Sequence, residues 1–212
     1  MIGLHLPSDG LDVLCLGAHP DDIEIGCGGT LLALGARERT TVRSAVLTGS
    51  ELRAEEARNA ARAFGVTDLA LSSLPDGRLP AHWAEVKQTL EDLATGPRPD
   101  VVLAPRPDDS HQDHRLIAEL VSTTWRDSLV LHYEIPKWDG DLSRATHYVP
   151  LTAEQAHRKV ELLHDSFVSQ KDRDWWDDET FLGLMRLRGI ECRAPYAEAF
   201  TAPKVLLDLR RP

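Results

Sequence analysis

The sequence is poor in cysteine and in aromatic residues. Its 212 residues include 3 cysteines, and aromatic side chains make up 6% of the chain. Cys15, Cys27 and Cys192 are odd in number and far apart, which excludes a disulfide framework as the basis of the fold. Unpaired thiols suit a reducing compartment, so we expect a cytoplasmic protein.

Basic side chains and long apolar runs are also scarce. The chain has 24 Lys and Arg against 34 Asp and Glu, a formal net charge of −10. Nucleic-acid binding requires basic side chains that neutralise phosphates, and anionic lipid surfaces require the same. No window approaches the ~18 apolar residues of a membrane span, and the first residues do not resemble a signal peptide. We therefore expect no nucleic-acid and no membrane partner, while a homo-oligomer remains possible.

Short apolar runs alternate with helix-period segments over residues 1–135. This alternation is typical of β-α-β units and predicts an α/β fold with a mostly parallel sheet and helices on both faces. The expected strands are Leu11–Leu16, Val42–Leu47, Asp68–Leu71, Val101–Ala104 and Leu129–Tyr133. The expected helices are Thr30–Arg39, Arg53–Phe64, Trp83–Leu93 and Gln112–Trp125.

The alternation decays after residue 135. At roughly 150 residues per domain, the length favours a single domain over residues 1–212, with a core over 1–135. Residues 136–212 are then a small C-terminal α/β extension that covers one edge of the sheet. Its expected parts are a polar loop Pro136–Val149, a helix Thr152–His164 capped by Thr152, an acidic segment Asp172–Glu179, a helix Thr180–Arg188 and a short apolar stretch Val205–Leu209.

Two segments that follow expected strands are dense in His and Asp. Ligands of open α/β sheets bind at the carboxyl ends of the strands. The first strand is followed by His19-Pro20-Asp21-Asp22, and the fourth by a segment that ends in His111-Gln112-Asp113-His114. These loops face each other if their strands are neighbours in the sheet.

The two segments together predict a catalytic metal site. Such a zinc site uses three protein ligands drawn from His and carboxylate and keeps one position open. His19 and Asp22 are three apart in a turn, and His114 supplies the third ligand. Asp21 then stands beside the metal without ligating it, as a general base must. His111 and Asp113 are likewise free to act on a reaction.

Non-catalytic interpretations compete with this one. The segment Gly26–Leu31 follows a strand and precedes a helix, as in a dinucleotide-binding unit, but it lacks the third small residue of G-x-G-x-x-G. We interpret its glycines as allowing tight packing behind the metal ligands. A binding module with a structural metal is a second alternative, although a structural zinc site normally has four protein ligands and only three are evident. Other histidines are interpreted as surface or hydrogen-bonding residues: His5, His82, His132, His147 and His157.

Both segments resemble the signatures of a known family. Ala18-His19-Pro20-Asp21-Asp22, with Glu24, Gly26 and Gly28-Gly29-Thr30-Leu31, resembles the first motif of the PIG-L/LmbE-like deacetylases, and His111-Gln112-Asp113-His114 is similar to their His-x-Asp-His motif. The likeness covers most of the chain, including Leu47–Glu51, the helix with Arg53, Glu56 and Arg58, and the late segments Arg188-Gly189 and Tyr196–Phe200.

The resemblance implies a zinc-dependent hydrolase with a Rossmann-like fold that removes an acetyl group from an N-acetylglucosamine-type amide. By motif position, the zinc ligands are His19, Asp22 and His114, and Asp21 is the general base. His111, in its protonated form, would stabilise the oxyanion or donate a proton, with Asp113 as its electrostatic partner. Arg53 matches a position that contacts substrate. Other divalent ions also suit such a donor set.

The substrate is not selected by any residue of the sequence. The loop that contains Trp138 and the pair Trp175-Trp176 are candidates, because aromatic faces stack on sugar rings; the alternative for the pair is burial in the core or at an interface. Phe167 stands where many family members carry a histidine before a Ser-Gln pair. An amidase acting on a larger acyl group or a thiol conjugate therefore remains an alternative to an amino-sugar deacetylase.

Overall fold

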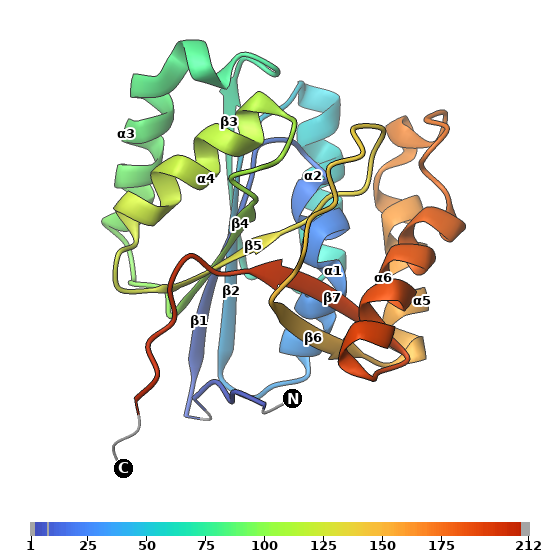
Figure 1. Cartoon of the computed structure of the whole chain (residues 1–212). Helices are drawn as coiled ribbons and strands as arrows, with labels where there is room; N and C mark the ends of the chain where they lie inside the picture. The colour runs from blue at the N-terminus through green and yellow to red at the C-terminus, as the bar shows by residue number, and fades with distance from the viewer. Residues whose placement is uncertain (1–2, 8, 209–212) are drawn as a thin grey trace.

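The computed structural model describes residues 3–7 and 9–208, and in these residues seven strands form one sheet (Figure 1). The strand order is β3-β2-β1-β4-β5-β7-β6; β1 to β5 are parallel, and β7 runs antiparallel to both β5 and β6. The bounds are β1 Leu11–Gly17, β2 Thr40–Thr48, β3 Asp68–Leu74, β4 Val101–Pro105, β5 Leu129–Tyr133, β6 His147–Leu151 and β7 Tyr196–Thr201. The predicted α/β class is confirmed.

Helices cover both faces of the sheet. On one side lie α3 and α4, and on the other lie α1, α2, α5 and α6 (Figure 1). The bounds are α1 Asp22–Gly35, α2 Glu51–Ala63, α3 Trp83–Ala94, α4 Gln112–Thr124, α5 Ala153–Ser166 and α6 Asp178–Cys192, with short 3-10 turns η1 at Leu79–His82 and η2 at Val168–Gln170. Thr152 caps α5 as expected, through a capping box with Gln155.

Alternation along the strands builds two apolar cores. Successive side chains of a strand point to opposite faces. On β1, Leu14 and Leu16 pack with α3 and α4 in one core, while Val13 and Cys15 pack with α1 and α5 in the other. Each of these four side chains is at most 2% exposed. The central strands are apolar in both directions because both faces are covered.

Helix α1 begins earlier than the sequence pattern indicates. We expected a helix over Thr30–Arg39, whereas α1 begins at Asp22 and ends at Gly35. The glycines that suggested a loop lie inside the helix because neighbouring elements approach it closely. A Cβ on Gly26 would lie 2.1 Å from the ring of Tyr133, and one on Gly28 would lie 2.8 Å from Phe64.

A break inside α1 is bridged by a buried ion pair. Cys27 has non-helical φ and ψ of −144° and 20°, which interrupts the backbone hydrogen bonds of the helix. Glu198 accepts hydrogen bonds from the freed amides of Gly29 at 2.8 Å and Thr30 at 2.6 Å. Lys159 donates to the Ile25 carbonyl at 2.6 Å and to Glu198 at 2.7 Å. The C-terminal elements thus satisfy both ends of the break.

The C-terminal segment adds strands to the sheet, which the sequence analysis missed. The expected loop Pro136–Val149 already enters β6 at His147, and β7 over Tyr196–Thr201 was not assigned as a strand. Because β7 pairs with β5 on one side and β6 on the other, the segment extends the sheet as well as covering it. Residues 205–208 of the expected apolar stretch have no regular structure, and Leu209 lies outside the described residues.

Strand order positions the functional loops. The chain moves outward in opposite directions from β1 and β4, and these two strands are direct neighbours. Loops that follow strands on either side of such a switch point enclose a crevice at the carboxyl edge. Among the described residues, no helix is long and apolar enough to cross a membrane.

Candidate active site

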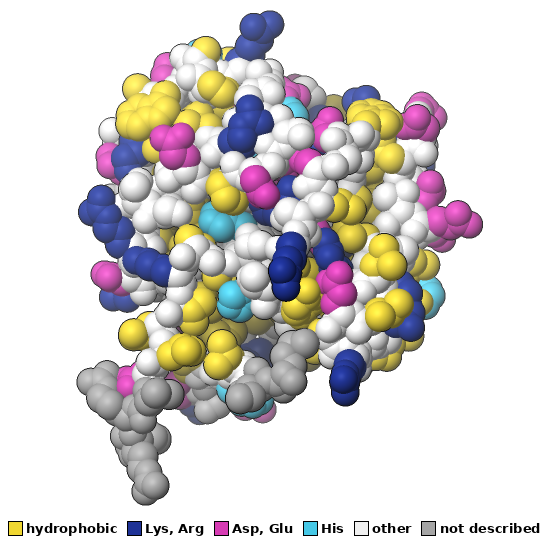
Figure 2. Space-filling model, in the orientation of Figure 1, with side chains coloured by type: hydrophobic (Ala, Val, Ile, Leu, Met, Phe, Trp, Pro, Cys, Tyr) yellow, Lys and Arg dark blue, Asp and Glu magenta, His cyan; other side chains and the backbone are white. Residues whose placement is uncertain are grey.

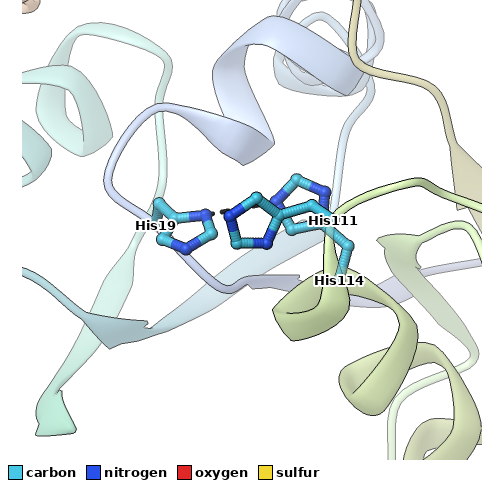
Figure 3. Close-up of side chains that lie close together, drawn as sticks. All are labelled: His19, His111 and His114. Atoms are coloured by element: carbon cyan, nitrogen blue, oxygen red, sulfur yellow. Dashed lines mark hydrogen bonds between the residues drawn. The ribbon is translucent and has the colours of Figure 1, made fainter. Parts of the chain in front are cut away.

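Neighbouring strands bring the two His/Asp segments together. His19, Asp21 and Asp22 lie between β1 and the start of α1, while His111 and His114 lie at the start of α4, after β4. In Figure 3 the imidazole rings of His19, His111 and His114 gather between these elements.

Three predicted metal ligands form a compact donor set. His19 Nδ1 lies 3.1 Å from His114 Nε2, and Asp22 Oδ2 lies 3.4 Å and 3.2 Å from these two nitrogens. A tetrahedral zinc with bonds of about 2.0–2.1 Å holds its ligand atoms roughly 3.3 Å apart. His111 also offers a ring nitrogen within 4.8 Å of those of His19 and His114. The donors present therefore fit a divalent ion.

The backbone holds Asp22 in place. Its Oδ2 accepts hydrogen bonds from the amides of Ala18 and His19, both at 2.8 Å. Burial alone would raise the pKa of Asp22, but the charges of His114 and His19 keep it well below its usual range. The carboxylate is therefore ionised at neutral pH, as a metal ligand must be.

Both histidines of this donor set lie in a strongly negative environment. Burial would lower the pKa of His19, but Asp22, Asp113 and Asp76 overcome this effect and raise it to about 12. The pKa of His114 is raised to about 9 because Asp22 and Asp109 outweigh its burial. The surrounding carboxylates thus favour a cation at this point, either a proton or a metal ion.

A buried carboxylate lies behind each of the two rings. Asp109 Oδ2 is 3.0 Å from His114 Nδ1, and Asp113 Oδ2 is 3.3 Å from His19 Nε2. Asp109 is 2% exposed and Asp113 is fully buried. Asp113, which we expected as the electrostatic partner of His111, does act on that ring through its charge, but the ring that its carboxylate contacts within hydrogen-bond distance is that of His19. Carboxylates at this place orient ligating imidazoles and fix their tautomers.

Asp21 lies beside the donor set in a strained backbone conformation. Its φ of 128° lies in the region that non-glycine residues avoid; such conformations cost of order 1–3 kcal/mol and are concentrated at functional sites. Arg53 donates a hydrogen bond to Asp21 Oδ2 at 2.6 Å. Burial raises the pKa of Asp21 to about 6, although Arg53 opposes the shift. Asp21 therefore changes charge near neutral pH, as a general base does.

Arg53 is fixed from several directions. It donates to Glu56 at 2.7 Å and to the Ser169 hydroxyl at 3.1 Å, and also to the Pro20 carbonyl. Its guanidinium lies over the ring of Phe167, 5.6 Å from the centroid. Arg53 thus reaches the site as expected, and its observed contacts orient Asp21.

His111 caps helix α4 with its ring. Its Nδ1 accepts a hydrogen bond from the Asp113 amide at 3.3 Å, which places the ring at the helix N-terminus. Burial, followed by the charges of His114 and His19, lowers the pKa of His111. We expected a protonated ring; the amide hydrogen bond at Nδ1 and the helix N-terminus both favour the neutral form instead.

The tryptophans of the C-terminal segment separate into buried and exposed groups. Trp176 is 4% exposed and packs against Phe181, so the burial alternative holds for it. Trp138 is 60% exposed, donates its indole N–H to Asp174 at 2.7 Å and meets Trp175 edge-on. Trp138 is thus held in place with most of its surface open to solvent.

Two charged residues of this region were not assigned to the site from sequence. Asp76 Oδ1 lies 3.1 Å from His19 Nε2, and its side chain is 72% exposed. Lys137 donates a hydrogen bond to Asp109 at 3.1 Å. Asp76 follows β3, so the rule that selected the other two loops would also have selected it.

Charges of both signs are interspersed on one face of the molecule. On the face drawn in Figure 2, basic and acidic side chains alternate and form no basic stripe.

All three cysteines lie within the described residues and are unpaired.

Comparison with known proteins finds deacetylases among the similar sequences. The chain is 31% identical over 137 residues to an uncharacterized deacetylase, YaiS, of Escherichia coli, covering 58% of this chain and 74% of that protein. It is 32% identical over 120 residues to the diacetylchitobiose deacetylase of Thermococcus kodakarensis, covering 49% of this chain and 45% of that protein. It therefore spans less than half the length of that second relative.

Solved structures share the fold. The conserved protein TT1542 of Thermus thermophilus superposes with a TM-score of 0.75 at 24% identity, over 95% of this chain and 100% of the other. The N,N'-diacetylchitobiose deacetylase of Pyrococcus horikoshii superposes with a TM-score of 0.74 at 22% identity, over 92% and 84%. The profile of the GlcNAc-PI de-N-acetylase family, PIG-L, matches residues 14–125, which include both His/Asp segments. The chain therefore belongs to the PIG-L family of deacetylases.

Proposed function

We propose that this protein is a zinc-dependent hydrolase that removes an acetyl group from an N-acetylated amino sugar or its conjugate. The observation that carries the proposal is the donor set of His19, Asp22 and His114, with Asp21 beside it and not needed as a ligand. The names of the relatives support the substrate class, since two of the similar proteins are diacetylchitobiose deacetylases.

His19, Asp22 and His114 would hold the ion. Two imidazoles and one carboxylate form the three-ligand set of catalytic zinc sites, although other divalent ions also accept it. When bound, the ion would polarise the amide carbonyl and make an attacking water more acidic.

Asp21 is proposed as the general base. Its carboxylate takes a proton from the attacking water and then returns it to the amine that leaves. The raised pKa, about 6, suits both steps, because the group is ionised before the attack and yet acidic enough once protonated. Arg53 holds the carboxylate in one orientation through the 2.6 Å hydrogen bond.

His111 is proposed as a neutral hydrogen-bond donor. Its Nδ1 is engaged by the Asp113 amide, so the ring proton resides on Nε2. That N–H is available to stabilise the negative oxygen of the tetrahedral intermediate. Because the neutral ring has no second proton to give, protonation of the leaving amine is assigned to Asp21.

Substrate contacts are assigned to Trp138 and Arg53. The exposed indole of Trp138 is held by Asp174 and is suited to stack on a sugar ring. The Arg53 guanidinium adjoins Asp21 at the site, and any contact with substrate is additional to its role in orienting the base. The small-molecule substrate and the cytoplasmic location both remain proposals.

The test is the variant Asp21→Asn. It should lower deacetylation of N-acetylglucosamine derivatives by about 10²- to 10⁴-fold, because the base is removed, and should leave metal content at about one ion per chain, because the three ligands remain. Asp165→Asn, which changes an exposed carboxylate of α5, is the control.

Amine release and metal content are measured together, before and after chelation. Full activity in Asp21→Asn would refute the assigned base. A substrate panel that varies only the acyl chain distinguishes a deacetylase from an amidase for larger acyl groups or thiol conjugates.

A further inference from the structure

Asp113 is a fully buried carboxylate held by a loop that neither His/Asp segment contains. Gly77 donates its amide to Asp113 Oδ2 at 2.8 Å, and Leu79 donates to Oδ1 at 3.0 Å. Gly77 has a φ of 71°, which favours glycine, and this turn aims both amides at one carboxylate. The loop between β3 and α3 therefore fixes the position and rotation of the Asp113 side chain.

The two ring nitrogens of His19 face different partners. Nδ1 faces His114 Nε2 and Asp22, while Nε2 faces Asp113 at 3.3 Å and Asp76 at 3.1 Å. A neutral imidazole carries a single N–H. If Nδ1 presents its lone pair to an ion, the proton must reside on Nε2, and there it needs an acceptor.

Of the two acceptors, Asp113 is the fixed one. The Asp76 side chain is 72% exposed, so water competes with its contact and screens its charge. Asp113 has no exposed surface and is anchored by two amides. A buried carboxylate is costly unless its oxygens are hydrogen-bonded. The amides of Gly77 and Leu79 supply two of these hydrogen bonds, and the N–H of His19 supplies a third.

His111 contacts Asp113 through the main chain. The hydrogen bond between them runs from the Asp113 amide to His111 Nδ1 and does not involve the carboxylate. The hydrogen bonds of the Asp113 carboxylate run instead to the amides of Gly77 and Leu79 and to the ring of His19.

We infer that Asp113 is a positioning residue for His19, whose tautomer and ring orientation it fixes, and that it does not serve His111. The inference rests on the proposed function to the extent that His19 Nδ1 is a metal ligand. It also gives the loop over residues 75–79 a role in metal binding, through the amides of Gly77 and Leu79. Asp109, 3.0 Å from His114 Nδ1, is the equivalent residue for the second imidazole.

The first test compares the metal affinities of Asp113→Asn, Asp109→Asn and Asp76→Asn by competition with a chromophoric chelator. The first two variants should bind zinc roughly 10- to 100-fold more weakly, as loss of a carboxylate behind a ligating histidine does. Asp76→Asn should stay within about twofold, because its contact is exposed. Unchanged affinity in Asp113→Asn would overturn the inference.

A second test separates His19 from His111. In the cobalt(II)-substituted protein, the exchangeable ring N–H of His19 should shift in the NMR spectrum of Asp113→Asn and should not shift in His111→Ala. If the Asp113→Asn defect were instead confined to turnover and vanished in a His111→Ala background, Asp113 would act through His111. Merely structural damage would broaden the whole spectrum and lower the melting temperature.

The parent protein supplies a readout that needs no variant. Isotope-labelled histidine spectra of the metal-bound protein should show the His19 proton on Nε2, and a proton on Nδ1 would overturn the inference even if Asp113→Asn failed to fold. The metal-affinity and NMR measurements use no substrate. If the protein bound metal but cleaved no amide, the proposed deacetylase activity would be refuted and the role of Asp113 would stand. If it bound no divalent ion, both the proposed activity and the role of Asp113 would be refuted.

Discussion

At the scale of single residues, the site shifts the pKa values of the neighbouring side chains Asp21 and Asp22 in opposite directions. Burial raises the pKa of Asp21, whereas the histidine charges hold that of Asp22 well below its usual range. Two adjacent aspartates thus differ in the ease with which they bind a proton. Environments that separate the pKa values of similar groups distinguish the base from the ligand.

The pH dependence of activity tests this separation. Activity should fall as the pH drops through about 6, because Asp21 must be ionised to accept a proton. Arg53 lowers the pKa of Asp21, so Arg53→Met should raise that pKa and move the acidic limb of the kcat/KM profile to higher pH. Arg58→Met is the control, because Arg58 lies on the same helix and pairs with the exposed Glu55 at 3.1 Å. An acidic limb that stayed in place in Arg53→Met would contradict the assignment.

At the scale of elements, α1 combines glycines with contacts to strands that are distant in sequence. Its first turn carries Asp22, so the packing of α1 determines where this proposed ligand lies. The glycines allow Tyr133 and Phe64 to approach the helix. Tyr133 in turn donates its hydroxyl to the Leu16 carbonyl at 2.6 Å, which joins β5 to the end of β1 just before the site.

Two glycine substitutions should have opposite effects on stability. Gly26→Ala should destabilise the protein by roughly 1–3 kcal/mol or more, because the added Cβ would lie 2.1 Å from the Tyr133 ring. Gly183→Ala, in α6, should stabilise it by about 0.5–1 kcal/mol, because nothing lies within 4 Å and alanine favours the helix. Urea unfolding measures both. Equal stability of the two variants would show that α1 can shift away from β5.

At the scale of the whole molecule, the C-terminal segment completes the core and is more than a cover. Strand β7 pairs with β5, and Lys159 and Glu198 satisfy the break in α1. Arg188 on α6 makes two 2.7 Å hydrogen bonds to Glu134, just after β5. These contacts couple residues 136–208 to the first 135.

Unfolding should therefore be a single transition. Two variants, one that keeps Trp125 as its single tryptophan and one that keeps Trp176, report on the regions after α4 and near α6. Their urea midpoints should coincide, because residues 1–135 and 136–208 satisfy each other's buried hydrogen bonds. A chain that ends at Ile135 should lack cooperative unfolding, since the amides of Gly29 and Thr30 would lose Glu198. Two separate transitions would indicate two domains instead of the single one expected.

Local sequence determined the parallel part of the fold and indicated the proposed donor residues. The five strands from Leu11 to Tyr133 follow apolar runs, and His19, Asp22 and His114 follow strand ends, so both are readable from short segments. Periodicity is a local property, and the chemistry of a ligand depends on its residue type. The late strand β7 was missed because its Tyr-Ala-Glu-Ala-Phe-Thr pattern includes Glu198, whose burial makes sense only beside α1.

Tertiary structure alone decided which carboxylate serves which histidine. Asp113 is two residues from His111 in sequence, yet its carboxylate faces His19, 94 residues away, because the β3–α3 loop turns it there. The same holds for Asp76, which reaches His19 from the loop after β3. The direction of a side chain depends on the elements that pack against it, and these come from distant parts of the chain. The spacing of residues within one segment therefore cannot predict that direction.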